Sequence, residues 1–401
     1  NEKENQGAIK RYFMRKWTNG TDFLYGNRVN VGNSQYLFGA KTLEDACVTN
    51  YTYSGTEFGG AKMVYWLTNH DRSRFLTDCF SINSDAVGAF RGAMTFGWAW
   101  TQIPMVYNGD EIGMYGTASG RPNYDDGGQR ASYENFLNNY YTESIGGNIN
   151  KMYKLMGFLR RYYKSLRTGS IEYLYNGEYS EPMAFVRKGN AGETNVLYVW
   201  NNNASEQKTI NIPVGSFAAN GDIFQNVFLT NDASYVDTSS YTVSAGILNL
   251  TLQPHQAMIL IHKGHNKIIS DASFRIKRGD LGFSEAYVQI KSPSCDTFYM
   301  MTDVNGYVKF SYFFEDTYTI AVIKDSYNTT YFNIYMRQGD TPVLEDSVFS
   351  NSKPNKPALI SPVSNQTIDY NNYTLQWTFS DPDAGDRQKQ IMIQIDTNIA
   401  M

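Results

Sequence analysis

The sequence is poor in cysteine, in charged residues and in long apolar runs, and each shortage excludes a class of protein. Its three cysteines, Cys47, Cys79 and Cys295, are too few for a disulfide framework, and the odd number leaves at least one free thiol. Charged residues make up 18% of the chain and the formal net charge is -4, so no basic surface for nucleic acid is expected. No apolar run approaches about 18 residues, which predicts no transmembrane helix.

Aromatic residues, by contrast, are abundant, with 31 tyrosines and 23 phenylalanines among 401 residues. Tyrosine and phenylalanine favour β-strands, and their rings also stack on the flat apolar faces of neutral ligands such as sugars. Both interpretations stay open for this chain. Its length exceeds one compact domain and suggests roughly two to four.

Two short apolar runs, 63–67 and 103–107, have the composition of buried parallel strands. Between them the spacing predicts a helix that Ser84 caps, and a later helix is expected to be capped by Asn148 and to stop at Gly169. A strand, a helix, a second strand and a second helix in this order predict a parallel sheet with right-handed crossovers.

From about residue 170 the apolar period changes to two, which predicts antiparallel β-structure. A first unit has strands expected near 184–186, 196–200, 209–212, 223–228 and 258–261. A second unit, 266–350, has strands expected at 287–290, 307–313 and 318–323 around the turn 303–306, whose Asn-Gly pair predicts a hairpin. A linker with prolines, 352–357, opens a third β-segment in which Tyr373, Leu375, Trp377 and Phe379 are expected on one face.

Polar residues follow both predicted parallel strands directly. Asn69, His70 and Asp71 come after the first strand, and the second strand runs into Gly109, Asp110 and Glu111. These two stretches, 64–74 and 102–114, resemble the seventh and eighth strands of the catalytic barrel of the α-amylase family, glycoside hydrolase family 13. The resemblance covers about two thirds of the chain.

The resemblance implies an α/β and all-β chain of four parts. Residues 1–168 would be the C-terminal part of a (β/α)8 TIM barrel, and residues 169–264 its C-terminal antiparallel β-sandwich. Residues 265–351 resemble a transthyretin-like carboxypeptidase regulatory domain, and 352–401 resemble the start of a fibronectin type III domain. We therefore expect a fragment, cut at both ends.

In function, the resemblance implies a retaining hydrolase of α-glucans such as starch or maltodextrin. Asp71 would be the carboxylate that stabilises the transition state, and His70 and Asn69 would contact the same sugar. Asp125 and Arg130, in a glycine-rich loop, would bind the non-reducing side of the substrate; a surface loop is the alternative. The nucleophile and the acid/base are not expected in this chain, so we expect the fragment alone to be inactive. Asp110 and Glu111 are expected to be structural.

Two other functions stay open. A transglycosylase of the same family would differ by excluding water from the acceptor site. A non-catalytic carbohydrate-binding surface protein would have the barrel fold without the catalytic residues, but the presence of both His70 and Asp71 argues against it. No cofactor or metal is identified, although the missing part could hold Ca²⁺, and the appended β-domains predict an extracellular or cell-surface protein, attached through its missing C-terminal part.

Overall fold

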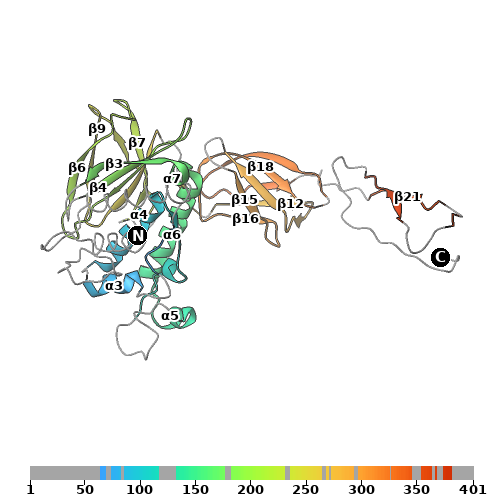
Figure 1. The fold of residues 1–401 in the computed structure, drawn as a ribbon, viewed down its shortest axis with the longest axis horizontal. Coiled ribbons are helices and arrows are strands. Elements are labelled where there is room, and N and C mark those ends of the chain that lie inside the picture. The colour runs from blue at the N-terminus through green and yellow to red at the C-terminus, as the bar shows by residue number, and fades with distance from the viewer. Residues whose placement is uncertain are drawn as a thin grey trace. The chain divides into compact units, whose positions relative to one another are not determined.

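A computed structural model of the chain provides the fold (Figure 1). The structure describes residues 64–68, 74–82, 85–116, 132–176, 182–230, 235–263, 268–270, 272–292, 297–325, 327–345, 354–363, 366–367 and 374–381. The chain divides into two compact units. Unit 1 comprises residues 1–270, 294–296 and 311–315, and unit 2 comprises 271–293, 297–310 and 316–401. Each unit is described by itself below.

Unit 1 begins with helices around a two-stranded parallel sheet, as the order of apolar runs predicts. Strand β1 pairs with β2 in parallel, with Val64 opposite Ile103 and Tyr65 opposite Pro104. The elements of this part are β1 (Val64–Tyr65), α3 (Phe75–Ile82), α4 (Ala86–Ala99), β2 (Ile103–Pro104), the short 3₁₀ helix η1 (Asp110–Ile112), α5 (Tyr133–Asn139), the π-helical turn η2 (Glu143–Gly147), α6 (Asn148–Tyr162) and α7 (Ser165–Thr168). The described residues show mixed α/β structure and no closed barrel.

Four details of the helix predictions are wrong. Two helices, α3 and α4, lie between the strands where one was expected. The N-cap of α4 is Asp85 rather than Ser84, because the Asp85 carboxylate accepts a hydrogen bond from the Gly88 amide at 2.9 Å. Asn148 is the first residue of α6 and not its cap, since the π-helical turn runs directly into that helix. The helix predicted to reach Gly169 also breaks after Tyr162, and a separate helix, α7, ends at Gly169.

The second part of unit 1 is an antiparallel β-sandwich, and strands β4, β5 and β10 of its larger sheet are buried on both faces. This sheet has the order β3-β4-β5-β10-β7-β8, and β6 pairs with β9 in the other layer. Every residue of β5 is buried. The strands are β3 (Ser170–Asn176), β4 (Met183–Lys188), β5 (Val196–Trp200), β6 (Lys208–Pro213), β7 (Ile223–Leu229), β8 (Ser240–Thr242), β9 (Ile247–Leu252) and β10 (Ala257–His262). The apolar pattern of the sequence predicted no strand at β3, β8 or β9.

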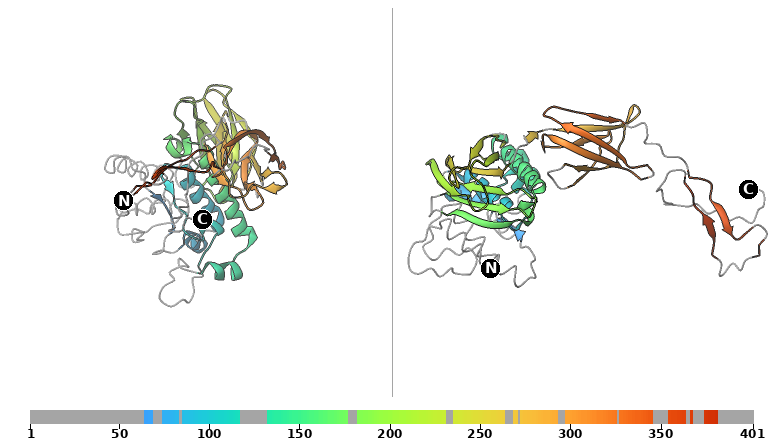
Figure 2. Two further views of the ribbon diagram at one scale, coloured as in Figure 1. Left: turned by 90° about the vertical axis from the view of Figure 1, so that its right-hand side faces the viewer. Right: turned by 90° about the horizontal axis from the view of Figure 1, so that it is seen from above.

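Alternate residues of the larger sheet pack on different partners, which explains its burial on both faces. Leu197 and Val199 belong to the sandwich core. Tyr198, between them, faces helix α4 and donates a hydrogen bond to the Gly92 carbonyl at 3.2 Å. Phe185 on β4 packs edge-on against Phe96 of α4, with ring centroids 5.8 Å apart. The sandwich and the helices accordingly stay side by side in the further views (Figure 2).

Two buried arginines fix the chain between α4 and β2. Arg187 of the sandwich donates to the carbonyls of Ala99 and Trp100 at 2.8 and 2.6 Å. Arg160 of α6 donates to the Trp100 carbonyl as well, at 3.0 Å, and to that of Gln102 at 2.7 Å. These hydrogen bonds satisfy carbonyls that the end of a helix leaves free. They hold the start of β2 against both the sandwich and α6.

Unit 2 is all-β, with one sheet of order β13-β12-β16, in which β20 also pairs with β12, and a second of order β15-β14-β18-β19. Its strands are β12 (Ser273–Arg278), β13 (Leu281–Gly282), β14 (Tyr287–Lys291), β15 (Phe298–Met301), β16 (Tyr307–Lys309), β18 (Asp316–Ile323), β19 (Thr330–Met336), β20 (Val343–Glu345), β21 (Ala358–Ser361) and β22 (Gln376–Thr378). Strands β21 and β22 pair with each other. As predicted, Leu375, Trp377 and Phe379 alternate with exposed neighbours and are half-buried, whereas Tyr373 lies outside the described residues.

The hairpin predicted at residues 303–306 is wrong. A turn forms there, with a hydrogen bond from the Gly306 amide to the Asp303 carbonyl, but it connects β15 to β16, which lie in different sheets. The strand expected over 307–313 is also interrupted. After β16 the chain forms β17 (Tyr312–Phe314), which pairs with β11 (Ile268–Ser270) inside unit 1. The boundaries at 168, 264 and 351, and the likeness of the last two segments to transthyretin-like and fibronectin domains, stay predictions.

Candidate functional site

The carboxyl ends of β1 and β2 form one edge, because the two strands are parallel neighbours. The amide of Met105 also donates to the Tyr65 carbonyl at 2.8 Å, which extends this pairing beyond the strands. Thr68 follows β1, and Asn108 to Glu111 follow β2. Chemistry-bearing residues of parallel α/β folds gather at such an edge. It is therefore the candidate functional site of this chain.

A buried ion pair ties the two strand ends together. Arg74 lies just before α3, and its Nη1 donates to Asp110 Oδ1 at 3.1 Å. Its Nη2 donates to the Asn108 carbonyl at 2.8 Å, and its guanidinium lies over the Tyr107 ring, 4.9 Å from the centroid. The side chains of Arg74 and Asp110 are only 2% and 4% exposed. The pair thus joins the segment after β1 to the turn after β2, away from solvent.

The Asp110 carboxyl has an unusual acidity. Burial raises its pKa to about 7, while the nearby Arg74 charge and a hydrogen bond with Thr68 act in the opposite direction. Desolvation of the charged form therefore exceeds the stabilisation by a neighbouring cation. A carboxyl that is held by an arginine and hidden from solvent cannot approach a substrate, which fits a structural role for Asp110.

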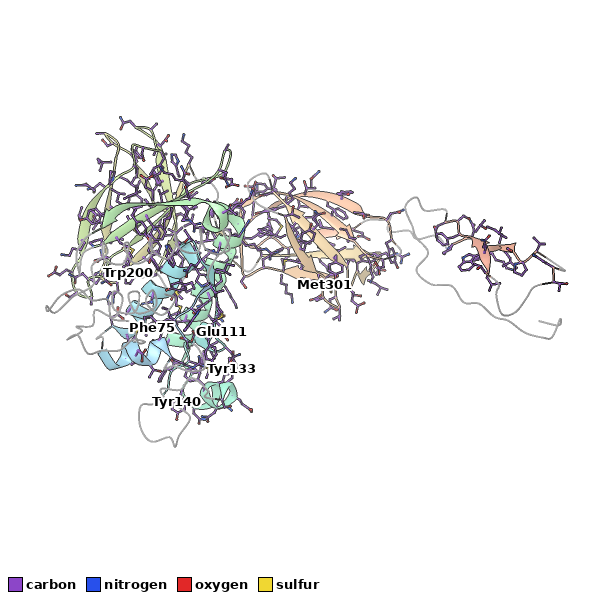
Figure 3. All side chains as sticks on the ribbon, in the orientation of Figure 1. Phe75, Glu111, Tyr133, Tyr140, Trp200 and Met301 are labelled. Atoms are coloured by element: carbon purple, nitrogen blue, oxygen red, sulfur yellow. The ribbon has the colours of Figure 1, made fainter. Side chains whose placement is uncertain are left out.

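Glu111 is engaged by its own turn. Its Oε2 accepts a hydrogen bond from the Gly109 amide at 2.8 Å, and its carbonyl accepts one from Asn150 Nδ2 at 3.3 Å. Gly109 has a φ of +95°, where a side chain would collide with Met114. Figure 3 marks Glu111 close to the helices that surround this edge. The turn after β2 therefore uses its carboxylates to hold its own shape.

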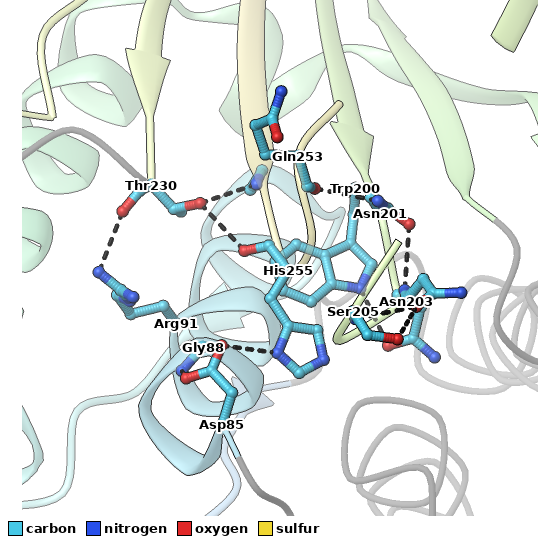
Figure 4. A network of polar contacts seen from close by, with 12 residues as sticks. Asp85, Gly88, Arg91, Trp200, Asn201, Asn203, Ser205, Thr230, Gln253 and His255 are labelled. Atoms are coloured by element: carbon cyan, nitrogen blue, oxygen red, sulfur yellow. Dashed lines mark hydrogen bonds and ion pairs between the residues drawn. The ribbon is translucent and has the colours of Figure 1, made fainter. Parts of the chain in front are cut away.

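A second polar network connects α4 to the sandwich (Figure 4). His255, from the turn before β10, donates from Nδ1 to Asp85 Oδ2 at 2.9 Å, and its ring stacks on Trp200 with centroids 5.5 Å apart. The hydrogen bond from His255 is the largest influence on Asp85 and lowers the pKa of its carboxyl. Asp85 thus caps α4 and binds the sandwich with the same carboxylate.

The predicted site residues fall outside the described residues. They are Asn69, His70, Asp71, Asp125 and Arg130. The structure describes both flanks of residues 69–73: the Phe75 amide donates to Thr68 Oγ1 at 3.3 Å, and Arg74 is held by Asp110. The roles assigned to the five residues stay predictions.

Sequence reasoning missed Arg74 and Thr68 as parts of this edge. A signal was present, since Arg74 stands directly before the apolar start of α3, where a cation needs a buried partner. The partner, Asp110, is 36 residues away, and only the parallel pairing of β1 with β2 brings the two together.

The described residues contain no group of three or more His, Cys, Asp or Glu side chains placed to hold a metal ion. Among the helices that the structure describes, none is long and apolar enough to cross a membrane. No cofactor was identified from the sequence, and a Ca²⁺ site outside this chain stays a prediction.

Comparison with known proteins gives structural likenesses but no match to a family model. The α-amylase of Geobacillus thermoleovorans, solved with acarbose, is 18% identical; the match covers 65% of this chain and 47% of that one, with a TM-score of 0.47. The cyclomaltodextrin glucanotransferase CldA is 19% identical; the match covers 64% of this chain and 43% of that one, with a TM-score of 0.44. AmyP, solved with maltose, is 16% identical; the match covers 64% of this chain and 48% of that one, with a TM-score of 0.48. The matching structures also include the α-amylase of H. orenii and a cyclomaltodextrinase. The chain spans less than half the length of these solved structures.

Proposed function

We propose that this chain carries the last strands of the catalytic barrel, and the following sandwich, of a retaining hydrolase that acts on α-glucans. One observation carries the proposal: β1 and β2 are parallel neighbours, and Arg74 and Asp110 fix their carboxyl ends to each other. In the sequence, Asn69, His70 and Asp71 stand between Thr68 and Arg74, and the proposal assigns them to that edge.

In the proposed mechanism Asp71 binds hydroxyl groups of the reacting sugar and holds them more strongly as the ring flattens toward the oxocarbenium-like transition state. His70 donates a hydrogen bond to the same sugar. Asp110 and Glu111 take no chemical part because Arg74 and the Gly109 amide engage them. Their task is to keep the two strand ends in place while the substrate is bound.

Retention needs two carboxyl groups about 5 to 5.5 Å apart across the scissile bond. Because the nucleophile and the acid/base are not expected in this chain, and Asp110 and Glu111 are both engaged, a polypeptide of residues 1–401 alone should release no reducing sugar from starch, maltodextrin or pullulan. An extracellular or cell-surface location and an α-glucan partner belong to the same proposal.

The stereochemistry of the products tests the proposed function. The complete protein should cleave maltooligosaccharides, and the first product seen by proton NMR should be the α-anomer. Cellooligosaccharides of the same length are the matched control and should stay intact. A β-anomer as first product, or cleavage of the cellooligosaccharide alone, would contradict the proposal.

A further inference from the structure

One face of the sheet β15-β14-β18-β19 in unit 2 exposes a set of tyrosines. Tyr287, Tyr299 and Tyr331 are 56%, 60% and 69% exposed, and Met301 beside them is 51% exposed. Figure 3 marks Met301 on this unit. The other face of the same strands is packed, with Ile290, Val288, Tyr318 and Ile320 all fully buried. The tyrosines therefore belong to the outer face, where a core-forming role does not explain them.

The strand register arranges these tyrosines across the whole sheet. Tyr299 lies opposite Gln289, Gln289 opposite Ala321, and Ala321 opposite Tyr331. Tyr299 and Tyr331 thus stand at the two edges of one row, about 14 Å apart across three strand spacings of about 4.8 Å. Tyr287 occupies the next row, one strand in from Tyr299. Rings spread over such a distance can contact several units of an extended chain, but not one small molecule.

The chemistry of this outer face fits a neutral ligand rich in hydroxyl groups. Among its strand positions only Lys291 carries a charge. Polar side chains stand between the rings: Gln289 donates to the Tyr299 hydroxyl at 3.4 Å, and Thr319 donates to Asn333 at 2.8 Å. Aromatic rings with amides and hydroxyls beside them combine an apolar stacking surface with hydrogen-bonding groups. A charged polymer would find few partners here, because Lys291 and Arg337, which follows β19 and lies over the Tyr335 ring, are the charged side chains on or directly after these strands that contact this face.

We propose that this outer face, which we call the tyrosine face, is a second carbohydrate site that binds extended α-glucan chains by stacking on Tyr287, Tyr299 and Tyr331. The low charge of this face and the wide spacing of its rings favour a polysaccharide as the ligand. The choice of an α-glucan rests on the proposed function of unit 1. The tyrosine face holds the polymer and takes no part in bond cleavage. Its contribution should therefore appear with long or insoluble glucans and be absent with short soluble ones.

Binding of the complete protein to insoluble starch tests this proposal. The double variant Tyr299→Ala/Tyr331→Ala should bind at least about tenfold more weakly, because two stacking surfaces are lost. Tyr299→Phe/Tyr331→Phe keeps both rings and should bind nearly as wild type. Leu281→Ala is the matched control, since Leu281 is 76% exposed in the other sheet of the same unit. Circular dichroism of each variant checks that the fold is kept.

Three results would overturn the proposal: equal binding by all variants, binding to cellulose but not to any α-glucan, or a self-association of the protein that depends on these tyrosines without glucan binding. The two proposals fail separately. Starch binding that depends on Tyr299 and Tyr331, without cleavage of maltooligosaccharides, would support the tyrosine face and contradict the proposed function. Cleavage of maltooligosaccharides without starch binding that depends on these tyrosines would support the proposed function and contradict the tyrosine face.

Discussion

Asp110 and Asp85 both face a basic side chain within unit 1, yet the pKa values of their carboxyls shift in opposite directions. Asp110, 4% exposed beside Arg74, has a raised pKa. Asp85, 44% exposed beside His255, has a lowered one. Burial dominates at the strand ends, and hydrogen bonding dominates at the helix cap. A basic partner therefore does not by itself set the acidity of a carboxyl.

The largest effect on the free energy of unfolding is expected at the buried pair of Arg74 and Asp110. Asp110→Ala should lower the free energy of unfolding by about 3 to 5 kcal/mol, because Arg74 would stay charged in the interior and lose the carboxylate of Asp110. Arg74→Met should cost less, since the remaining Asp110 carboxyl can take up a proton whereas a guanidinium cannot lose one. Urea denaturation of both variants checks the order, and a larger loss for Arg74→Met would contradict it.

A smaller effect is expected at the helix cap. Asp85→Ala removes the cap of α4 and the partner of His255, so the free energy of unfolding should fall by about 1 to 2 kcal/mol. Ser132→Ala is the matched control, because Ser132 caps α5 with an exposed hydrogen bond to the Asn135 amide alone. That variant should lose about 0.5 to 1 kcal/mol. Equal losses in the two variants would show that the hydrogen bond with His255 contributes nothing.

The smallest and most specific effect concerns pH. Asp110 holds a proton in the folded state up to about pH 7, while its ordinary pKa is 3.8, so its contribution to stability falls as pH rises between these values. Asp85 has a lowered pKa, so its contribution is present above the ordinary value of 3.8 and is lost as pH falls through the folded pKa.

Unfolding measured at several pH values separates the two carboxyls. Relative to wild type, Asp110→Asn should gain stability as pH rises from about 4 to about 7. Asp85→Asn should differ from wild type most at neutral pH and converge with it in acid. Parallel curves for wild type and both variants would show that neither pKa is shifted.

The sequence predicted those elements whose apolar pattern is long or repeated. The β5 strand, with every residue apolar, was predicted with its observed bounds, 196–200. The parallel strands were also expected, because each ends abruptly in polar residues. Strand β3 was missed since the pattern around 170–176 mixes polar and aromatic residues, and the turn at 303–306 was misassigned because turn chemistry does not reveal which sheet the next strand joins.

The candidate site was less predictable than the fold. Local motifs pointed to Asn69, His70 and Asp71, but the pair of Arg74 and Asp110 depends on strand pairing between distant segments. Similarly, His255 gave no signal in the sequence, because its partner Asp85 lies 170 residues away in another element. The tyrosine face also emerges only from the register, since its members come from separate strands.

The most direct measurement compares Asp71→Asn with Asp110→Asn in the complete protein, by steady-state kinetics on a maltooligosaccharide series and by thermal unfolding. If Asp71 stabilises the transition state and Asp110 holds the strand ends, Asp71→Asn should lower kcat by about 10²- to 10³-fold with an unchanged Tm. Asp110→Asn should change the Tm and leave the kcat of the folded enzyme close to wild type. An unchanged kcat in Asp71→Asn, or a lost kcat in a fully folded Asp110→Asn, would contradict the assignment of catalysis and structure at this edge.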